Sequence, residues 1–254
     1  MRLLVAAFRL ARAEAVLVAA LLITGLSIIA FAEIADDVAE ADTQAFDRFV
    51  LEAVRTPGEP GNPIGPHWVE IAMADLTALG GIAVLVVIAL VVSGFLLMRR
   101  RAIAVMFLAT ALGGGIVLSQ FLKGAFGRER PPVDFRAVEA VNPSFPSGHA
   151  MLSAVVYLTI GSLVAKAMPQ KRLKAYVMGV AIVLALVVGL SRVYLGVHWA
   201  SDVTAGWCIG AAWATVCWLA AWGFERFNGR QGISRPQHLP PGRAADNPAP
   251  AAGE

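Results

Sequence analysis

Six long apolar stretches follow one another along the chain, separated by polar segments. They cover approximately residues 14–32, 76–98, 102–122, 149–165, 175–195 and 203–223. About 20 apolar residues in a helix suffice to cross the roughly 30 Å hydrocarbon core of a bilayer. The pattern therefore predicts an all-α fold, a polytopic membrane bundle of six transmembrane helices within residues 1–230.

The segment between the first two spans, residues 33–75, has a pattern of its own. Apolar residues recur there at helical spacing beside charged ones, which predicts a short amphipathic helix on the membrane surface: Phe46, Phe49, Val50 and Val54 beside Asp47, Arg48 and Glu52. The following stretch, "TPGEPGNPIGP", is rich in turn residues and is not expected to form regular structure. Residues 231–254 are rich in Pro and Ala and are predicted to be a disordered cytoplasmic tail.

Composition agrees with a membrane protein. The chain is 57% hydrophobic and 15% charged, with a mean hydropathy of +0.67, which lies outside the range of ordinary soluble domains. We expect a lipid bilayer as its environment and no nucleic acid as a partner. Cys208 and Cys217 lie in an apolar run on unlike helical faces, so we interpret them as packing residues rather than a disulfide or a metal pair.

The distribution of charge predicts the topology. Basic residues gather before the first span, between the second and third, between the fourth and fifth, and after the sixth: Arg2, Arg9, Arg12, Arg99, Arg100, Arg101, Lys166, Lys171, Arg172, Lys174, Arg226, Arg230 and Arg235. If the spans alternate, all of these lie on one side, which the positive-inside rule makes cytoplasmic. Residues 33–75, on the other side, carry ten acids against Arg48 and Arg55. Both termini are therefore expected in the cytoplasm, and the segments 33–75, 123–148 and 196–202 outside.

The N-terminus allows a second interpretation. A basic start, an apolar core and Ala30-Phe31-Ala32 are also features of a cleavable signal peptide. The apolar run is long for a signal peptide, so we expect an uncleaved first span. Cleavage would leave the remaining topology unchanged.

Several charged residues break the pattern on the outer side: Lys123, Arg128, Arg130 and Arg136 after the third span, and Arg192 near the outer end of the fifth. Interfacial snorkelling, or pairing with Glu129, Asp134 and Glu139, explains Arg128 and Arg136 as well as a function does. The other three cations have histidines as neighbours in this topology. His149 begins the fourth span, and His198 precedes the sixth, with Asp202 four residues later.

This set of residues indicates chemistry on an anion. Residues at i and i+4 share a helix face, so Asp202 can accept a hydrogen bond from His198 and present its other ring nitrogen as a base or nucleophile. Two His and one Asp could also ligate zinc, but the neighbouring cations are unfavourable for a divalent metal. They suit a phosphate instead. Ser147 is a good N-cap, Gly148 allows close approach, and a helix start offers free N–H groups to an anion.

These residues form three motifs, "KGAFGRERP" (123–131), "PSGH" (146–149) and "SRVYLGVHWASD" (191–202). In order and on one membrane face, they resemble the signature of the type 2 phosphatidic acid phosphatases, which are related to vanadate-dependent haloperoxidases. No signature position departs from the family pattern. The motifs cover residues 123–202, and the six-span layout extends the resemblance to most of the chain. Residues 33–75 and the tail carry no family information.

The resemblance implies a mechanism and no cofactor. His198, oriented by Asp202, would attack phosphorus and form a phosphohistidine, while His149 would protonate the leaving oxygen and then activate water. The phosphoryl oxygens would be held by Lys123, Arg130, Ser147, Gly148 and Arg192. No metal is needed, because side chains supply the cations. His198 must be neutral while His149 is protonated, so a bell-shaped pH profile is expected.

A site at the outer ends of membrane helices meets a phosphate at headgroup depth. We therefore expect a lipid phosphate or diphosphate as substrate: undecaprenyl diphosphate, phosphatidylglycerol phosphate or phosphatidic acid. A phosphotransferase that passes the phosphoryl group to a lipid or sugar acceptor would use the same residues. A haloperoxidase is disfavoured because those relatives are soluble. An anion channel or lipid transporter is disfavoured because the charges cluster at one end of the spans. The sequence does not indicate an oligomeric state.

Overall fold

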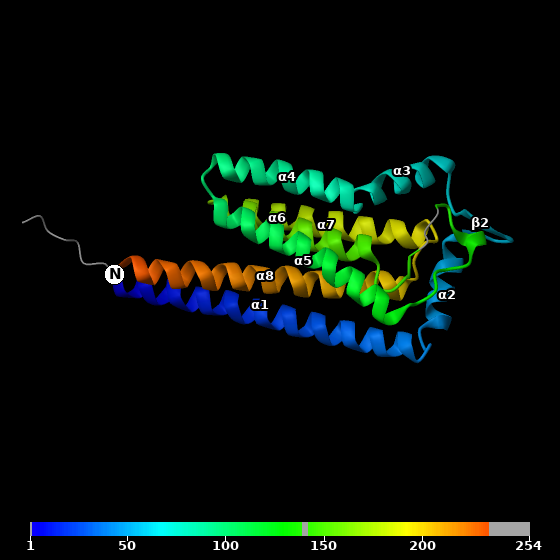
Figure 1. Ribbon diagram of the computed structural model, residues 1–254, viewed down its shortest axis with the longest axis horizontal. Helices are drawn as coiled ribbons and strands as arrows, with labels where there is room; N and C mark the ends of the chain where they lie inside the picture. Colours follow the sequence, from blue (N-terminus) through cyan, green and yellow to red (C-terminus); the bar gives the residue numbers. More distant parts are fainter. Residues whose placement is uncertain (1, 139–141, 234–254) are drawn as a thin grey trace, which may run out of the picture. The chain divides into compact units, whose positions relative to one another are not determined.

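The computed structural model describes residues 2–138 and 142–233, with side chains for 14–138 and 142–227. The elements are α1 (Arg2–Ala39), α2 (Gln44–Ala53), β1 (Arg55–Thr56), β2 (Glu59–Pro63), α3 (His67–Ala78), α4 (Ile82–Met98), α5 (Ala102–Phe126), the 3-10 turn η1 (Val133–Phe135), α6 (Gly148–Ala167), α7 (Lys171–Tyr194) and α8 (Ala200–Ile233). Contacts divide the chain into one unit over residues 1–221 and a second over 222–254. The first unit contains the helical bundle (Figure 1).

Five helices are long and apolar enough to cross a membrane, namely α1, α5, α6, α7 and α8, and the pair α3 and α4 forms a sixth candidate. The expected continuous helix over 76–98 is wrong, because this pair bends by 54° at a break around Gly80 (Figure 1). A Cβ at Gly80 would clash with Val188 and lie 3.2 Å from the His149 carbonyl oxygen, so only glycine fits this approach. The break is stabilised by the Tyr157 hydroxyl, which donates to the Leu79 carbonyl at 2.8 Å.

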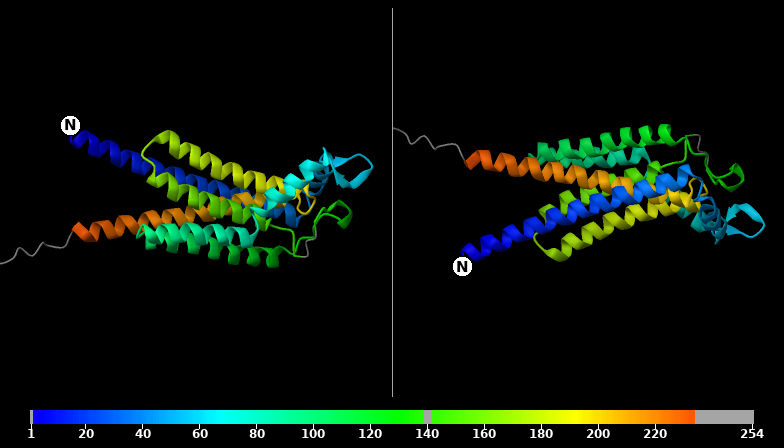
Figure 2. Two further views of the ribbon diagram at one scale, coloured as in Figure 1. Left: turned by 90° about the horizontal axis from the view of Figure 1, so that it is seen from above. Right: turned by 90° about the horizontal axis from the view of Figure 1, so that it is seen from below.

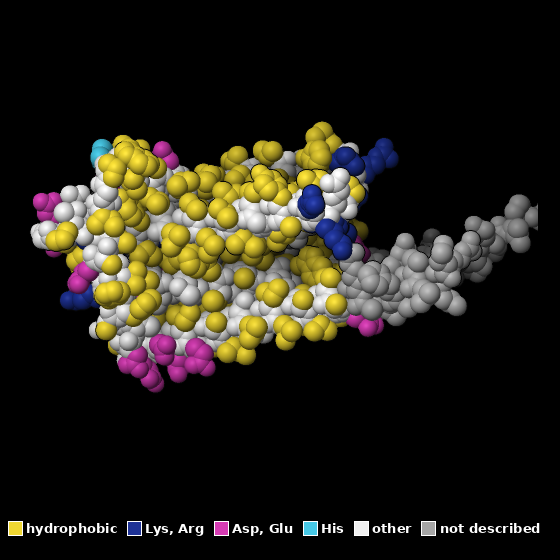
Figure 3. Space-filling view, turned by 180° about the vertical axis from the view of Figure 1, so that it is seen from behind, with side chains coloured by type: hydrophobic (Ala, Val, Ile, Leu, Met, Phe, Trp, Pro, Cys, Tyr) yellow, Lys and Arg dark blue, Asp and Glu magenta, His cyan; other side chains and the backbone are white. Residues whose placement is uncertain are grey.

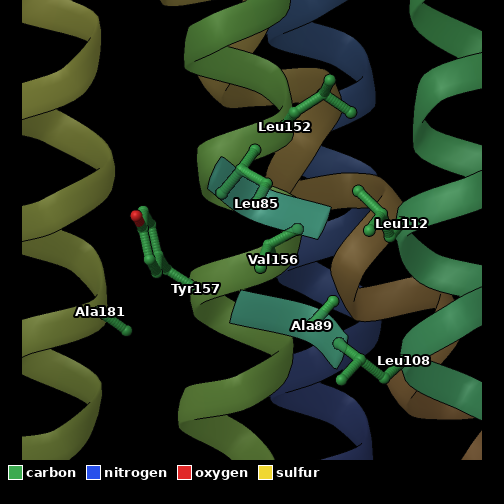
Figure 4. Packing of buried hydrophobic residues seen from close by; sticks show 8 residues of the cluster. All are labelled: Leu85, Ala89, Leu108, Leu112, Leu152, Val156, Tyr157 and Ala181. Atoms are coloured by element: carbon green, nitrogen blue, oxygen red, sulfur yellow. The ribbon is translucent and has the colours of Figure 1, made fainter. Parts of the chain in front are cut away.

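The core of the bundle is built around α6, which is the most buried of the candidate spans. Side chains of α6 pack there against side chains of α4, α5 and α7. Together they form the cluster shown in Figure 4: Leu85, Ala89, Leu108, Leu112, Leu152, Val156, Tyr157 and Ala181. α6 begins with the "GH" of the second motif. The best-packed helix of the protein therefore carries candidate site residues at its first turn.

The tryptophans of α8 fill gaps over glycines of neighbouring helices. A Cβ at Gly189 of α7 would clash with the Trp207 ring, and one at Gly114 of α5 would clash with Trp213. Each indole N–H reaches a backbone carbonyl, Trp207 that of Ala185 at 3.0 Å and Trp213 that of Ala111 at 2.9 Å. Such bonds satisfy polar groups that lipid cannot satisfy. The cysteines of this helix, Cys208 and Cys217, are free.

The segment between α1 and α3 is more regular than expected. The prediction that "TPGEPGNPIGP" lacks regular structure is wrong, because β1 pairs with β2 as a short antiparallel hairpin. Pro57 and Gly58 turn this hairpin, and Gly58 supplies the positive φ of +82°. The predicted amphipathic helix is α2, which lies with the hairpin at the same end of the bundle as the loop before α6 (Figures 1 and 2).

The orientation of α2 differs from a simple amphipathic pattern. Asp47 and Leu51 are buried against the protein, at 1% and 2% exposure. Phe46 and Phe49 are exposed, at 58% and 71%. The helix thus turns an acid inward and two aromatic rings outward.

Charge is distributed unevenly along the bundle. Figure 3 shows most Asp and Glu at one end of an apolar surface and most Lys and Arg at the other. The acidic end includes Glu33, Asp36 and Asp37 of α1, which are exposed. The helix α8 continues to Ile233, so positions 231–233 of the predicted tail are helical. Residues 234–254 of that tail lie outside the described residues.

The contact of α8 with α6 depends on two small residues one turn apart, Gly206 and Gly210. A Cβ at Gly210 would lie 2.6 Å from the Met151 carbonyl oxygen and 3.0 Å from the Ala154 Cβ. We predict that Gly210→Ala destabilises the protein by about 1–3 kcal/mol through overpacking. Thermal unfolding in detergent measures this. Gly113→Ala, where the added Cβ meets nothing within 4 Å, is the matched control. Equal melting temperatures for the two variants would contradict close packing at Gly210.

Candidate active site

A cavity of about 430 Å³ lies where the first turn of α6 meets the ends of α5 and α7. It collects residues from all three sequence motifs and from the break between α3 and α4. Its lining residues are Gly80, Ile82, Ser119, Gln120, Lys123, Arg130, Asn142, Gly148, His149, Leu152, Arg192 and His198. Six of the eight predicted site residues therefore face one space, and Ser147 and Asp202 lie behind this lining.

His198 lies in the short connection between α7 and α8 and is 2% exposed. Its Nδ1 is 3.3 Å from Asp202 Oδ2, and its Nε2 is 3.1 Å from Arg130 Nη1. A guanidinium can only donate hydrogen bonds, so Nε2 accepts and Nδ1 carries the proton of the neutral ring. The lone pair of Nε2 is therefore on the side of Arg130, which lines the cavity.

Asp202 is completely buried, in the first turn of α8. Its Oδ1 accepts a hydrogen bond from Arg128 Nη1 at 2.7 Å. Its Oδ2 accepts from the Trp199 backbone N–H at 3.0 Å and from the Ser144 hydroxyl. The Ser144 oxygen also lies 3.3 Å from His198 Nδ1. Both carboxylate oxygens are thus satisfied, and one of them is held toward the imidazole.

Burial determines the charge state of His198. Its pKa is lowered to about 3, mainly by desolvation and in part by Arg130 and Arg192, while the hydrogen bond and charge of Asp202 oppose this shift. The ring is therefore neutral at ordinary pH, as a nitrogen nucleophile must be.

Three cations of the cavity have neutral hydrogen-bond acceptors. Lys123 Nζ donates to the Pro143 carbonyl at 2.5 Å, and Arg192 Nη1 donates to the Thr77 hydroxyl at 3.0 Å. Arg130 donates to the carbonyls of Asn142 and Val197, and burial lowers its pKa. Within the described residues, the buried Arg192 Nε has no hydrogen-bond partner. This arrangement leaves positive charge available to an anion in the cavity.

The start of α6 closes the cavity from one side. Ser147 is the N-cap residue, as predicted, but its hydroxyl makes no capping hydrogen bond. That oxygen is buried without a partner in the described part of the chain. A Cβ on Gly148 would lie 3.4 Å from Ser119 Oγ and 3.6 Å from Lys123 Cε, so glycine keeps this wall open. The free N–H groups of the first turn suit an anion.

Sequence reasoning missed the partners of Arg128. It pairs with neither Glu129 nor Asp134 but with Asp47 of α2 and Asp202 of α8, each at 2.7 Å. Ser144 is a further site residue that the sequence does not indicate, since nothing in a loop sequence shows that its hydroxyl reaches Asp202. Arg136 donates to the Pro131 carbonyl at 2.6 Å, outside the cavity lining.

Comparisons with known proteins agree with this geometry. The family model of the PAP2 superfamily matches residues 104–226. Phosphatidylglycerophosphatase B of Bacillus subtilis (strain 168) is 34% identical over 145 residues, which is 56% of this chain and 70% of that protein. The chain belongs to the PAP2 superfamily. An undecaprenyl-diphosphatase of Sulfolobus acidocaldarius, also 34% identical, matches over 38% of this PAP2 chain and 45% of its own length.

The PAP2 fold is also found in a solved structure. A crystal structure of a transmembrane PAP2 type phosphatidylglycerolphosphate phosphatase from Bacillus subtilis superposes with a TM-score of 0.71. It is 27% identical, and the match covers 80% of this chain and 96% of that one. The predicted all-α membrane bundle and the family resemblance are confirmed. This PAP2 chain is a multi-pass membrane protein.

The cations of the cavity lead to a prediction that needs no turnover. Inorganic phosphate or vanadate at about ten times its Kd should stabilise the folded protein by about 1.4 kcal/mol, because it binds only the folded state. Thermal unfolding in detergent measures the shift. Arg192→Gln should reduce it, whereas Arg172→Gln, an exposed arginine in the first turn of α7, should not. Equal shifts in both variants would place anion binding elsewhere.

Proposed function

We propose that this protein hydrolyses a lipid phosphate or diphosphate through a phosphohistidine formed on His198. The observation that carries the proposal is the neutral imidazole held between Asp202 and Arg130 at a cavity lined by cations. Membership of the PAP2 superfamily and the names of its relatives, a phosphatidylglycerophosphatase and an undecaprenyl-diphosphatase, support the same reaction class.

In the first step, His198 Nε2 attacks phosphorus. The substrate phosphoryl group takes over the hydrogen bond of Arg130, which frees the nitrogen lone pair. The N–P bond forms while the bond from phosphorus to the lipid oxygen breaks. His149, on the same cavity, gives its proton to that leaving oxygen. Asp202 stabilises the positive ring that the attack creates, through the Nδ1–H hydrogen bond.

The cations act on the charge of the transition state. Lys123, Arg130 and Arg192 donate to the three phosphoryl oxygens, together with the Gly148 amide at the start of α6. The unpartnered Ser147 hydroxyl lies next to that amide and can donate by rotating its proton. In the second step, His149 accepts a proton from water, the water oxygen bonds to phosphorus, and the N–P bond breaks. Free phosphate leaves, and His198 is neutral again.

The position of the cavity favours a lipid substrate. Its lining includes Ile82, at the start of α4 and 45% exposed, and Leu152 of α6. Apolar side chains beside a phosphate site allow the headgroup to bind while the lipid tail remains in the bilayer. Phosphatidylglycerol phosphate, undecaprenyl diphosphate and phosphatidic acid are the candidates. A phosphotransferase that uses the same phosphohistidine is the second candidate function.

Phosphate release from detergent-purified protein in EDTA tests the function. The three candidate lipids are compared side by side, and the ratio of rates identifies the substrate class. His198→Ala should lower kcat by about a thousandfold or more, because it removes the nucleophile. His149→Gln should lower it by about a hundredfold or more, because general acid catalysis is lost.

The chain offers a matched control in His67, which is 80% exposed at the start of α3 and outside the cavity. His67→Ala should leave the rate within about twofold. Radiolabelled substrate should leave an acid-labile, base-stable label on His198 only. A labelled lipid or sugar acceptor without free phosphate would favour the phosphotransferase. A rate that survives in His198→Ala would exclude this mechanism.

We also propose that the cavity faces the periplasm, with both termini in the cytoplasm. The exposed arginines between α4 and α5 lie opposite the acidic end of α1, as the positive-inside rule requires. In intact cells, a membrane-impermeant maleimide should label Glu59→Cys, in the hairpin, and not Arg172→Cys, in the first turn of α7. Cys208 and Cys217 are internal controls within an apolar helix. Labelling of Arg172→Cys but not of Glu59→Cys would contradict the proposed orientation and indicate the opposite one.

A further inference from the structure

Asp47 is a buried acid in α2, a helix that precedes the family match at residues 104–226. Its side chain is 1% exposed, and both of its carboxylate oxygens accept hydrogen bonds from residues beside the candidate site. Its Oδ1 accepts the Ser201 backbone N–H at 2.9 Å, and its Oδ2 accepts the Ser201 hydroxyl at 2.6 Å. Ser201 is the neighbour of Asp202. The proposed reaction assigns no role to this acid.

One guanidinium joins Asp47 to the site. Arg128 Nη2 donates to Asp47 Oδ2 at 2.7 Å, and its Nη1 donates to Asp202 Oδ1 at 2.7 Å. The same two nitrogens also donate to Thr43, before α2, and to Ser201. The guanidinium of Arg128 therefore bridges two carboxylates that are 155 positions apart in sequence. Its planar geometry fixes the positions of both carboxylates.

We propose that Arg128, held in place by Asp47 of α2, is a positioning residue that fixes Asp202 and keeps His198 in its neutral, nucleophilic form. The proposal rests on the proposed function of His198. Arg128 binds Oδ1 of Asp202, so Oδ2 is the oxygen left for the imidazole. Its positive charge also offsets the charge of Asp202, which would otherwise favour a protonated ring.

The alternative is that Arg128 only fastens α2 to the bundle. The two roles differ in their effect on protonation. The charged groups around His198 are Asp202 of α8, Arg128 and Arg130 of the loop after α5, Arg192 of α7, His149 of α6 and Lys123 of α5. Removing Arg128 leaves Asp202 less neutralised, so the pKa of His198 should rise. Removing Asp47 leaves Arg128 to neutralise Asp202 alone, so that pKa should not rise.

The first measurement is kcat/KM for phosphate release between about pH 2.5 and about pH 9, which reports pKa values of the free enzyme. The full-length protein should show its acid limb well below about pH 5, because the pKa of His198 lies near 3. In Arg128→Gln the limb should move up by about one unit or more, with a loss of about ten- to a hundredfold at neutral pH. Arg128→Lys keeps the positive charge but loses the two-nitrogen geometry of the guanidinium. It should restore the acid limb to its original pH but recover only part of the rate.

Asp47→Asn tests the contact between Asp47 and Arg128. It should lower kcat/KM several-fold without raising the acid limb. In the Arg128→Gln background it should have no further effect, because both residues act through one path. Glu52→Gln is the matched control, an exposed acid on the same helix given the same chemical change. It should behave as the unaltered protein does.

A second measurement does not depend on turnover. The chain contains four histidines, so ring ¹⁵N NMR of labelled protein in detergent can be assigned with His198→Ala. His198 should show a proton on Nδ1 and none on Nε2, and should titrate at higher pH in Arg128→Gln. An unchanged titration there, with an unchanged acid limb, would overturn the proposal. If Arg128→Gln does not fold, Arg128→Lys decides the question, because a fully normal kcat/KM without the two-nitrogen geometry of Arg128 would overturn the proposal. If no lipid releases phosphate, the proposed function fails while the NMR titration still decides this inference.

Discussion

A buried carboxylate, that of Asp202, organises this end of the bundle. An unpaired charge in such a place is very costly, so the fold must bring hydrogen-bond donors to both oxygens. The donors come from segments distant in sequence: a guanidinium after α5, a hydroxyl before α6, and an imidazole and an amide before α8. The backbone carbonyl of Asp202 also accepts the Ser147 N–H at 3.0 Å. Satisfying one acid therefore joins the starts of α6 and α8 to the loop between α5 and α6.

The membrane-embedded part of the bundle makes that convergence possible. Gly206 and Gly210 let α8 approach α6 closely, and Gly80 lets the break before α4 approach His149. Lipid offers no hydrophobic force to press helices together, so close packing and hydrogen bonds from indole and phenol groups must hold them. The same contacts fix the first turn of α6, and hence Gly148 and His149. Rigid helices thus position groups that the loops alone would leave less well placed.

Sequence patterns predicted the parts of the structure that depend on local composition. Hydrophobic length located five spans and the bent helix pair that forms the sixth candidate, and the three motifs located residues that the fold gathers around one cavity. The break at Gly80 was missed because a hydropathy pattern does not show that a Cβ would clash with Val188. The hairpin was missed because turn residues mark its ends without showing the pairing. Asp47 did leave a signal: it shares the inward face of α2 with Leu51, where an acid requires a partner. The identity of that partner, Arg128, is a long-range fact that no local pattern contains.

The four cations of the site divide into two roles according to their partners. Arg128 forms ion pairs with two buried acids, Asp47 and Asp202. In the described part of the chain, the hydrogen bonds of Lys123, Arg130 and Arg192 go to carbonyls, a hydroxyl and a neutral imidazole, and none of these groups compensates their charges at short range. Uncompensated buried or half-buried cations are unfavourable, and in the proposed reaction the bound phosphate dianion offsets that cost. In the proposed reaction, the ion pair with Arg128 leaves Asp202 without a salt bridge to the three cations that would bind the phosphoryl group. Under the proposed function, this separation of the acids from the other three cations serves both the orientation of His198 and the binding of phosphate.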